Sequence, residues 1–388
     1  MSQGVVAPKG FRAAGVTAGL KTSGASDLAL VVNDGPRFDA AGVFTRNKVK
    51  AAPVLWSQQV LTTGQLRAVV LNSGGANACT GPEGFQTAHA TAEKAAELLG
   101  CGAIEVAVCS TGLIGRQLPR DLVLAGVEKA AAGLADSAAA GLAAATAIMT
   151  TDTVAKQAVH NDQAGWSIGG TTKGAGMIAP SMATMLSVLT TDAVLEPAAL
   201  DSALRAAVRV SFDRLDVDGS MSTNDTVLLL ASGASGITPA ADEFTAALTA
   251  VCQDLARQMQ ADAEGVTKRI TVRVTGAADE DDAVTIARTV ARDSLVKTAI
   301  FGSDANWGRI AAAVGYSDAE VDPDRLDVTI NDALLCKGGV AAGGRTDADL
   351  SGKDVLVEIE LGIGAGTAEI RTTDLSHGYV EENSAYPT

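Results

Sequence analysis

The pattern of apolar and polar positions predicts strands and helices that alternate along the whole chain. Strands are predicted in short runs that are apolar or alternating and rich in β-branched residues: 28–32, 68–71, 104–109, 186–190, 227–230, 270–274, 326–330, 355–361 and 368–372. Helices are predicted over 85–99, 120–131, 197–210, 241–261, 281–300 and 307–314. Pro197 stands in a helix-opening position and Gly100 in a helix-stop position, whereas the alanine-rich stretch 130–147 fits either a helix or a loose connection. The alternation predicts an α/β protein with layered helices and sheet.

The composition is that of a globular protein and limits its partners. Its 388 residues suggest two or three compact units at about 150 residues each. Apolar residues make up 47% of the chain and aromatic residues only 3%, so the core must consist of Ala, Val, Leu and Ile. The net charge of −15 repels nucleic acid and anionic membrane surfaces. Because no apolar run has the form of a signal peptide or a membrane span, we expect a cytoplasmic protein.

The cysteines and histidines favour neither a disulfide framework nor a zinc site. The five cysteines are odd in number and none is spaced as CxxC, so we expect free, buried thiols. The three histidines lie outside any recognisable nucleophile or ligand motif, and we expect no metal. A Ser-His-Asp or Cys-His enzyme remains open, but it has few candidates for its base. We expect a nucleophilic enzyme of this composition to activate its nucleophile in another way.

Two loops resemble ligand-binding motifs without matching them. The stretch 72–81, NSGGANACTG, lacks the glycine spacing of dinucleotide and phosphate loops, so we interpret it as a tight loop that shapes a pocket. The stretch 215–225, LDVDGSMSTND, lacks the sixth-position glycine and twelfth-position glutamate of a calcium loop. We interpret it as an acidic surface or pocket loop.

Two further glycine-containing stretches place chemically useful groups. In GGTTKGAGM, residues 169–177, Lys173 is either a solvated charge or a fixed cation that faces an anionic ligand. In CSTGLIG, residues 109–115, a predicted strand ends in a Ser-Thr-Gly turn. Gly112 lets the backbone approach a ligand there, and an exposed N–H or hydroxyl at such a turn can stabilise an oxyanion. The alternative is an ordinary turn.

The pair Ala183-Thr184 stands directly before an apolar run in MIAPSMATMLSVLTTDA, residues 177–193. One reading is that both are simply packing and strand residues. The other is self-cleavage: the Thr184 hydroxyl attacks the preceding carbonyl, an N-to-O acyl shift gives an ester, and water hydrolyses it. The resulting N-terminal amine, with a reference pKa of about 7.7–8.0, can act as base for its own hydroxyl. This chemistry needs no histidine, metal or cofactor.

A set of motifs resembles the ornithine acetyltransferase family of arginine biosynthesis. The motifs occur in order from near residue 30 to the last residue: NSGGANACTG, CSTGLIG, AIMTTDT (147–153), KGAGMIAPSMATMLSVLTTDA (173–193), DGSMSTNDT (218–226), DAEGVTK (262–268), SLVKTAIFGSDANWGRI (294–310) and SHGYVEENSAYPT (376–388). The one visible departure is Ala305, where the family commonly has proline.

The resemblance implies an enzyme that moves the acetyl group of N2-acetyl-ornithine to glutamate in a ping-pong cycle. It makes Thr184 the self-cleavage residue and nucleophile, which divides the chain after Ala183 into an α chain, 1–183, and a β chain, 184–388, that fold together. It assigns Thr111 and Gly112 to the oxyanion hole. It also implies an N-terminal-nucleophile-like architecture with its own connectivity, and an assembly of two α and two β chains or larger. Some family members also take acetyl-CoA as donor, and no residue here decides this.

The resemblance also assigns substrate contacts, which are Thr150, Lys173, Thr184, Glu264, Asn383 and Thr388. Lys173 suits a substrate α-carboxylate and Glu264 suits the cationic ornithine amine. The polar C-terminal tail would ordinarily be a frayed end. Here we expect it to fold over the pocket, anchored by Tyr379 and Tyr386.

Two other function classes remain as alternatives. A self-cleaving aminopeptidase would use the same threonine or serine chemistry on a similar layered fold, but it would hydrolyse peptides. A ligand-binding protein without enzymatic activity would keep the pocket and show no chain cleavage.

Overall fold

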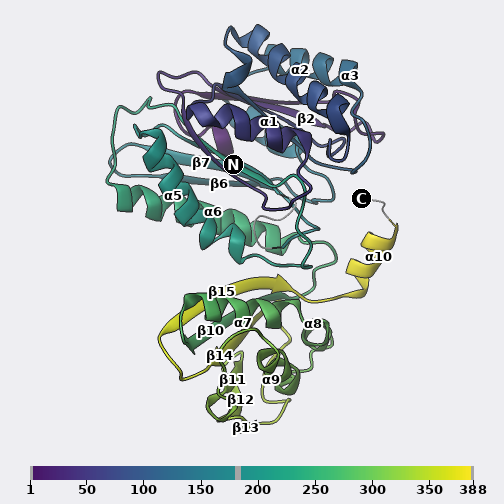
Figure 1. The fold of residues 1–388 in the computed structure, drawn as a ribbon, viewed down its shortest axis with the longest axis vertical. Helices are drawn as coiled ribbons and strands as arrows, with labels where there is room; N and C mark the ends of the chain where they lie inside the picture. Colours follow the sequence, from purple (N-terminus) through teal and green to yellow (C-terminus); the bar gives the residue numbers. More distant parts are fainter. Residues whose placement is uncertain (1–2, 180–184, 386–388) are drawn as a thin grey trace. The chain divides into compact units, whose positions relative to one another are not determined.

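The computed structural model describes residues 3–179 and 185–385, which form two compact units. The first unit comprises 1–213 and 220–259, and the second comprises 214–219 and 260–387. Figure 1 shows both, coloured along the sequence. The two units agree with the number expected from chain length.

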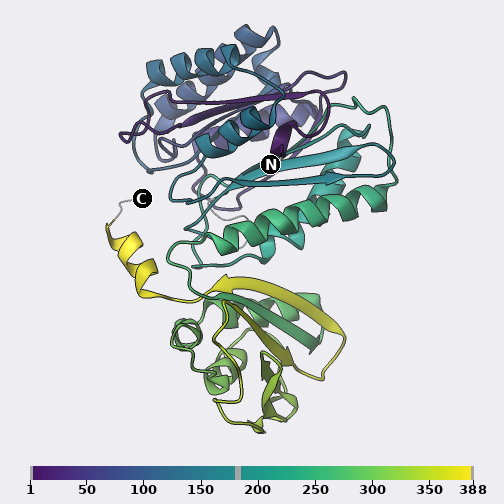
Figure 2. The ribbon, with the colours of Figure 1, turned by 180° about the vertical axis from the view of Figure 1, so that it is seen from behind.

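The first unit contains two sheets with helices on their outer sides. Its strands are β1 Phe11–Val16, β2 Leu28–Asn33, β3 Asp39–Phe44, β4 Ala68–Asn72, β5 Val106–Ser110, β6 Lys156–Asn161, β7 Ser167–Lys173, β8 Leu186–Thr191 and β9 Thr226–Ala231. Its helices are α1 Ala52–Val60, α2 Gly81–Leu99, α3 Arg120–Ala132, α4 Ala138–Ala147, α5 Pro197–Arg209 and α6 Ala241–Ala261. Helices α2 and α3 cover the sheet that contains β2, and α5 and α6 lie beside the sheet that contains β7, as Figures 1 and 2 show from opposite sides.

Both sheets of the first unit contribute to one apolar core. One sheet has the strand order β1-β2-β4-β5 and the other β3-β9-β8-β7-β6. Leu28 and Leu30 of the first sheet share a buried cluster with Leu186 and Val188 of the second. Strands that are covered on both faces are buried along their whole length, as β2, β4, β5, β8 and β9 are.

Three strands of the second sheet bring distant parts of the chain to one edge. Strand β7 pairs antiparallel with β8, so that Lys173 lies opposite Leu186. Strand β9 runs parallel to β8, with Thr226 beside Leu186. The end of β7 and the starts of β8 and β9 therefore meet at the same edge, where the segment 174–185 connects β7 to β8.

The second unit is a six-stranded sheet with helices on one face. The strand order is β13-β12-β11-β14-β10-β15, formed by β10 Arg269–Ala277, β11 Asp327–Ile330, β12 Ala333–Lys337, β13 Val340–Ala341, β14 Asp354–Glu360 and β15 Gly366–Thr373. Helices α7 Glu280–Arg292, α8 Ser294–Phe301 and α9 Trp307–Gly315 share a buried cluster with the sheet, whereas α10 His377–Ala385 follows β15 and lies apart from the sheet (Figures 1 and 2). Strand β10 alternates buried and half-buried positions, because Ile270, Val272 and Val274 face the helical layer while the residues between them face away.

The structure confirms the layered α/β class and corrects several local predictions. The single helix predicted over 281–300 is two helices, because Asp293 has an extended backbone and its side chain accepts a hydrogen bond from the Val296 N–H, which starts a new helix. The strand predicted from 104 begins at Val106, after a short 3-10 turn. The alanine-rich stretch forms the end of α3 and all of α4. Strands β1, β3, β6, β7, β12 and β13 and helices α1 and α10 were not predicted.

The expectations from composition are partly corrected as well. All five cysteines are described and unpaired, but Cys79 is exposed and Cys101 half-buried, so only three are buried thiols. In residues 3–179 and 185–385, no helix has the length and apolar character needed to cross a membrane.

Candidate active site

The site residues predicted from the sequence fall into three groups. Ala183, Thr184 and Thr388 lie outside the described residues. Thr111, Gly112, Thr150 and Lys173 belong to the first unit, and Glu264 and Asn383 to the second. Within the first unit Lys173 contacts Thr111, and within the second Asn383 contacts Glu264.

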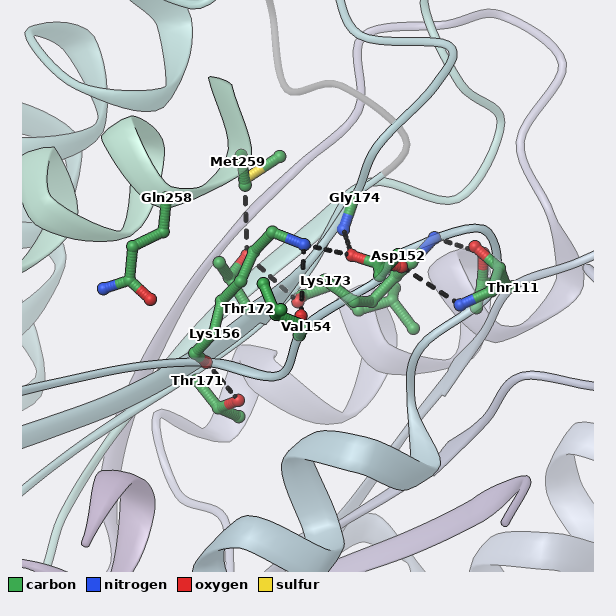
Figure 3. Close-up of polar contacts among 12 residues, drawn as sticks. Thr111, Asp152, Val154, Lys156, Thr171, Thr172, Lys173, Gly174, Gln258 and Met259 are labelled. Carbon is green, nitrogen blue, oxygen red and sulfur yellow. Dashed lines mark hydrogen bonds and ion pairs between the residues drawn. The ribbon is translucent and has the colours of Figure 1, made fainter. Parts of the chain in front are cut away.

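Thr111 directly follows the buried strand β5, and its side-chain hydroxyl is the group that can bind a ligand. The Thr111 N–H already donates to the Asn72 carbonyl at 2.9 Å, so the backbone continues the pairing of β5 with β4. Its Oγ1 accepts a hydrogen bond from Lys173 Nζ at 3.3 Å (Figure 3). Because the ammonium group has no acceptor, the proton of the Thr111 hydroxyl is directed to another partner.

Gly112 follows with a backbone that favours glycine. Its φ of +125° lies in a region that residues with a side chain rarely adopt, and a Cβ there would lie 2.8 Å from Gly75 N. Gly112 is exposed, and its N–H has no hydrogen-bond partner in the described ranges. The Thr111 hydroxyl and the Gly112 N–H are thus two adjacent donors suited to an oxyanion.

Lys173 lies in a buried charge cluster centred on Asp152, a residue that the sequence reasoning did not single out. The Asp152 carboxylate accepts from Lys156 Nζ at 2.7 Å and from the Gly174 N–H at 2.7 Å (Figure 3). It also accepts from the Thr150 N–H at 3.0 Å. Burial acts to raise the pKa of Asp152, but the charges of Lys173 and Lys156 and the hydrogen bonds outweigh it and hold the pKa at about 2. The carboxylate is therefore ionised at neutral pH. Its only signal in the sequence was its place in the motif AIMTTDT.

A second cation that the sequence reasoning missed is held beside Thr150. Lys21 Nζ donates to the Met149 carbonyl at 2.7 Å and to the Ser26 carbonyl at 3.0 Å. Partial burial lowers the pKa of Lys21; the charges of Asp27 and Asp152 oppose this shift and the charge of Lys173 adds to it. Lys21 therefore belongs to the same group of interacting charges as Lys173 and Asp152.

Glu264 and Asn383 form a separate polar contact in the second unit. The buried Glu264 accepts a hydrogen bond from Asn383 Nδ2 at 2.9 Å, and the same amide group donates to the Tyr379 carbonyl at 3.0 Å. The tail is helical through α10, and the Ser376 hydroxyl accepts from the Tyr379 N–H at 3.0 Å at its start. Burial raises the pKa of Tyr379 to about 12, with the charges of Asp218 and Glu264 adding to the shift. The tail is therefore an anchored helix up to residue 385; Tyr386 lies outside the described residues.

No metal centre is present among the described side chains: none of the His, Cys, Asp and Glu residues there cluster in a way that would hold an ion. The groups that are available are hydroxyls, amides, ammonium groups and carboxylates. They suit the binding of a zwitterionic molecule and the stabilisation of an oxyanion.

Comparisons with known proteins match almost the whole chain. The sequence profile of the ArgJ family matches residues 12–388. The arginine biosynthesis bifunctional protein ArgJ of Mycolicibacterium paratuberculosis is 64% identical over 389 residues, which cover 99% of this chain and 96% of that protein. The protein of the same name from Streptomyces coelicolor is 60% identical and covers 98% of this chain and 99% of its own length. A solved structure, the ornithine acetyltransferase of Mycobacterium tuberculosis complexed with ornithine, is 64% identical with a TM-score of 0.46, over 46% of this chain and 95% of that one.

Proposed function

This chain belongs to the ArgJ family, and we propose that it transfers the acetyl group of N2-acetyl-ornithine to glutamate through an acetylated Thr184. The family predicted from the motifs is confirmed, and with it the acyltransferase activity in arginine biosynthesis. The observation that carries the residue-level proposal is the hydrogen bond from Lys173 to Thr111. It joins the proposed carboxylate-binding cation to the proposed oxyanion donor.

Self-cleavage between Ala183 and Thr184 is the first step of the proposal. The segment that contains this bond connects two paired strands, with Lys173 opposite Leu186. Cutting it would leave β7 and β8 paired in the same sheet, so the chains 1–183 and 184–388 would stay folded together. The new α-amine of Thr184 would then serve as base for its hydroxyl.

Acetyl transfer is the second step of the proposal, and the groups described above would support it. The Thr184 hydroxyl attacks the acetyl carbonyl of acetylornithine, ornithine leaves, and the amine of glutamate then takes the acetyl group. The Thr111 hydroxyl and the Gly112 N–H would stabilise the oxyanion in both half-reactions. Lys173 would hold the α-carboxylate that both substrates carry, and Glu264 the ornithine side-chain amine.

Further contacts and the cellular context complete the proposal. Thr150, Asn383 and Thr388 would contact the substrate. The chemistry uses no cofactor and no metal, and we propose an assembly of two α and two β chains or larger in the cytoplasm. Assaying glutamate with acetyl-CoA would decide whether acetyl-CoA is a second donor.

Intact-mass spectrometry of active protein tests the self-cleavage step. We expect two chains, 1–183 and 184–388, in place of the uncut 39.1 kDa chain. Thr184→Ala should abolish both cleavage and transfer, whereas Thr184→Ser, which keeps a hydroxyl, should still be cleaved. Thr190→Ala removes the buried hydroxyl of a threonine in β8 and is the control that should be cleaved normally. Fully active protein that stays uncut would refute the proposal.

Steady-state kinetics test the transfer step. Varying acetylornithine and glutamate together should give parallel lines in double-reciprocal plots, because the acetyl group rests on Thr184 between the two half-reactions. Intersecting lines would indicate direct transfer in a ternary complex. Peptide hydrolysis without acetyl transfer would favour the aminopeptidase alternative.

A further inference from the structure

The carboxyl group of Asp225 is fully buried and bonded to the residue that follows Thr184. Its side chain has 0% exposure, and its Oδ1 accepts a hydrogen bond from the Met185 N–H at 3.0 Å. The Met185 carbonyl in turn accepts from the Thr226 N–H at 3.2 Å. Met185 is thus held on both its N–H and its carbonyl by the start of β9.

The loop that carries Asp225 is fixed to the strand that leads into Thr111. The neighbouring Asn224 side chain donates to the Ser110 carbonyl at 2.8 Å and to the Ala76 carbonyl at 2.6 Å. Ser110 is the last residue of β5, directly before Thr111. One buried loop therefore connects the proposed oxyanion residues to the peptide that follows the proposed nucleophile.

The second carboxyl oxygen of Asp225, Oδ2, takes no part in the hydrogen bond to Met185. Oδ2 is buried and has no hydrogen-bond partner in the described part of the chain. Complete burial raises the pKa of Asp225 well above its usual range, and the hydrogen bond from the Met185 N–H and the charge of Lys173 oppose this only in part. Oδ1 can accept the Met185 N–H whether the carboxyl is neutral or ionised.

We propose that Asp225 is a positioning residue for Thr184 that fixes the Thr184–Met185 peptide by accepting the Met185 N–H, in self-cleavage and in acetyl transfer; this rests on the proposed function of Thr184. A peptide unit is planar, so a hydrogen bond that holds the Met185 N–H also restricts the orientation of the carbonyl group of Thr184 in the same unit. The hydroxyl of that residue must reach first the Ala183 carbonyl and later the acetyl carbonyl. Small errors in such geometry cost large factors in rate.

Three variants test this role in the full chain. Asp225→Ala removes the acceptor of the Met185 N–H, whereas Asp225→Asn keeps an oxygen that can accept it. Asp192→Ala is the matched control, because Asp192 is a buried aspartate at the opposite end of β8 whose Oδ1 accepts the Ser167 N–H at 2.7 Å. Self-cleavage is followed by intact mass over time, kcat and KM are measured per cleaved protein, and thermal melting reports folding.

The expected results separate positioning from stability. Asp225→Ala should slow cleavage by about tenfold or more and lower kcat by a similar factor, with KM within about twofold of wild type. Asp225→Asn should stay within about threefold of wild type, and Asp192→Ala should cleave at the wild-type rate even where its melting temperature falls. Asp225→Ala that folds and cleaves normally would overturn the proposal.

The conservative variant keeps the test decisive when the alanine variant does not fold. A folded Asp225→Asn protein that fails to cleave would overturn the acceptor role, and one that cleaves normally would support it. The underlying proposed function is judged separately, on wild type and Thr184→Ala. Wild-type protein that is never cut would refute that function whatever the Asp225 variants do.

Discussion

Replacing Asp152 by asparagine should destabilise the first unit strongly. The Asp152 and Lys156 side chains are both 0% exposed and lie 2.7 Å apart, and Lys173 also interacts with the carboxylate charge. Asparagine has nearly the same shape, so the change removes mainly the charge. Breaking a buried ion pair by removing one partner costs about 3–5 kcal/mol, because the remaining charge stays desolvated.

The pKa of Asp152 gives an independent and smaller value for the contribution of its charge to the free energy of unfolding. A folded-state pKa of about 2 against an ordinary value of 3.8 means that the ionised carboxylate is stabilised on folding. This corresponds to roughly 2 kcal/mol at neutral pH, which is smaller because it does not include the cost of the uncompensated lysine charges. The contribution is complete above the unfolded-state pKa and is lost as the pH falls from about 4 towards 2. Asp152→Asn should lack this part of the acid sensitivity.

Urea unfolding followed by tryptophan fluorescence measures the loss. The control is Asp34→Asn, which breaks an exposed pair in the same unit, where Arg12 and Asp34 are 39% and 38% exposed; its cost should be about 1 kcal/mol or less. Adding Lys156→Met to Asp152→Asn should recover part of the loss, since it removes an uncompensated charge. If Asp152→Asn costs no more than Asp34→Asn, the buried cluster does not have the energetic role argued above.

Two further substitutions separate the steps of catalysis. Thr111→Val removes the hydroxyl but keeps the shape; it should lower kcat by about 10²–10³ with little change in KM, because an oxyanion donor acts mainly in the transition state, and a change in KM alone would contradict this role. Asn383→Ala removes the amide beside Glu264 and should lower kcat/KM for acetylornithine by about tenfold while self-cleavage stays intact. Ser384→Ala, on the exposed neighbouring residue, is its control, and equal effects of the two would indicate that the tail contributes only its fold.

The sequence predicted those helices and strands whose pattern of apolar and polar residues matches their burial in the folded protein. Helix α6 was predicted with both ends correct, and the apolar runs of β8 and β9 were placed within a residue or two. Strand β7 was missed because its sequence, SIGGTTK, is rich in glycine and threonine, although every one of its residues is buried. Its strand character comes from pairing with β6 and β8, which no local pattern contains.

The candidate site divides in the same way. Thr111, Gly112 and Lys173 could be identified from the sequence, because they lie in short motifs that carried the family resemblance. Asp225 stands in a stretch that was interpreted as an acidic surface or pocket loop, and Asp152 entered only as part of a motif of the family resemblance. Their burial depends on partners far along the chain: Asp152 accepts from Gly174, and Asp225 from a residue 40 positions away.

The local charge at this sheet edge would let a chain with a net charge of −15 hold the substrate carboxylate proposed above. Solvent-exposed charges more than about 8–10 Å away are largely screened at physiological salt, so the nearby buried groups contribute most to the local field. The groups whose charges act on Lys21 and Asp152, together with these two, are three lysines and two aspartates: Lys21, Lys156, Lys173, Asp27 and Asp152. These five groups carry one positive charge in excess. The complete burial that raises the pKa of Asp225 favours its neutral form, and so keeps one further negative charge away from Lys173.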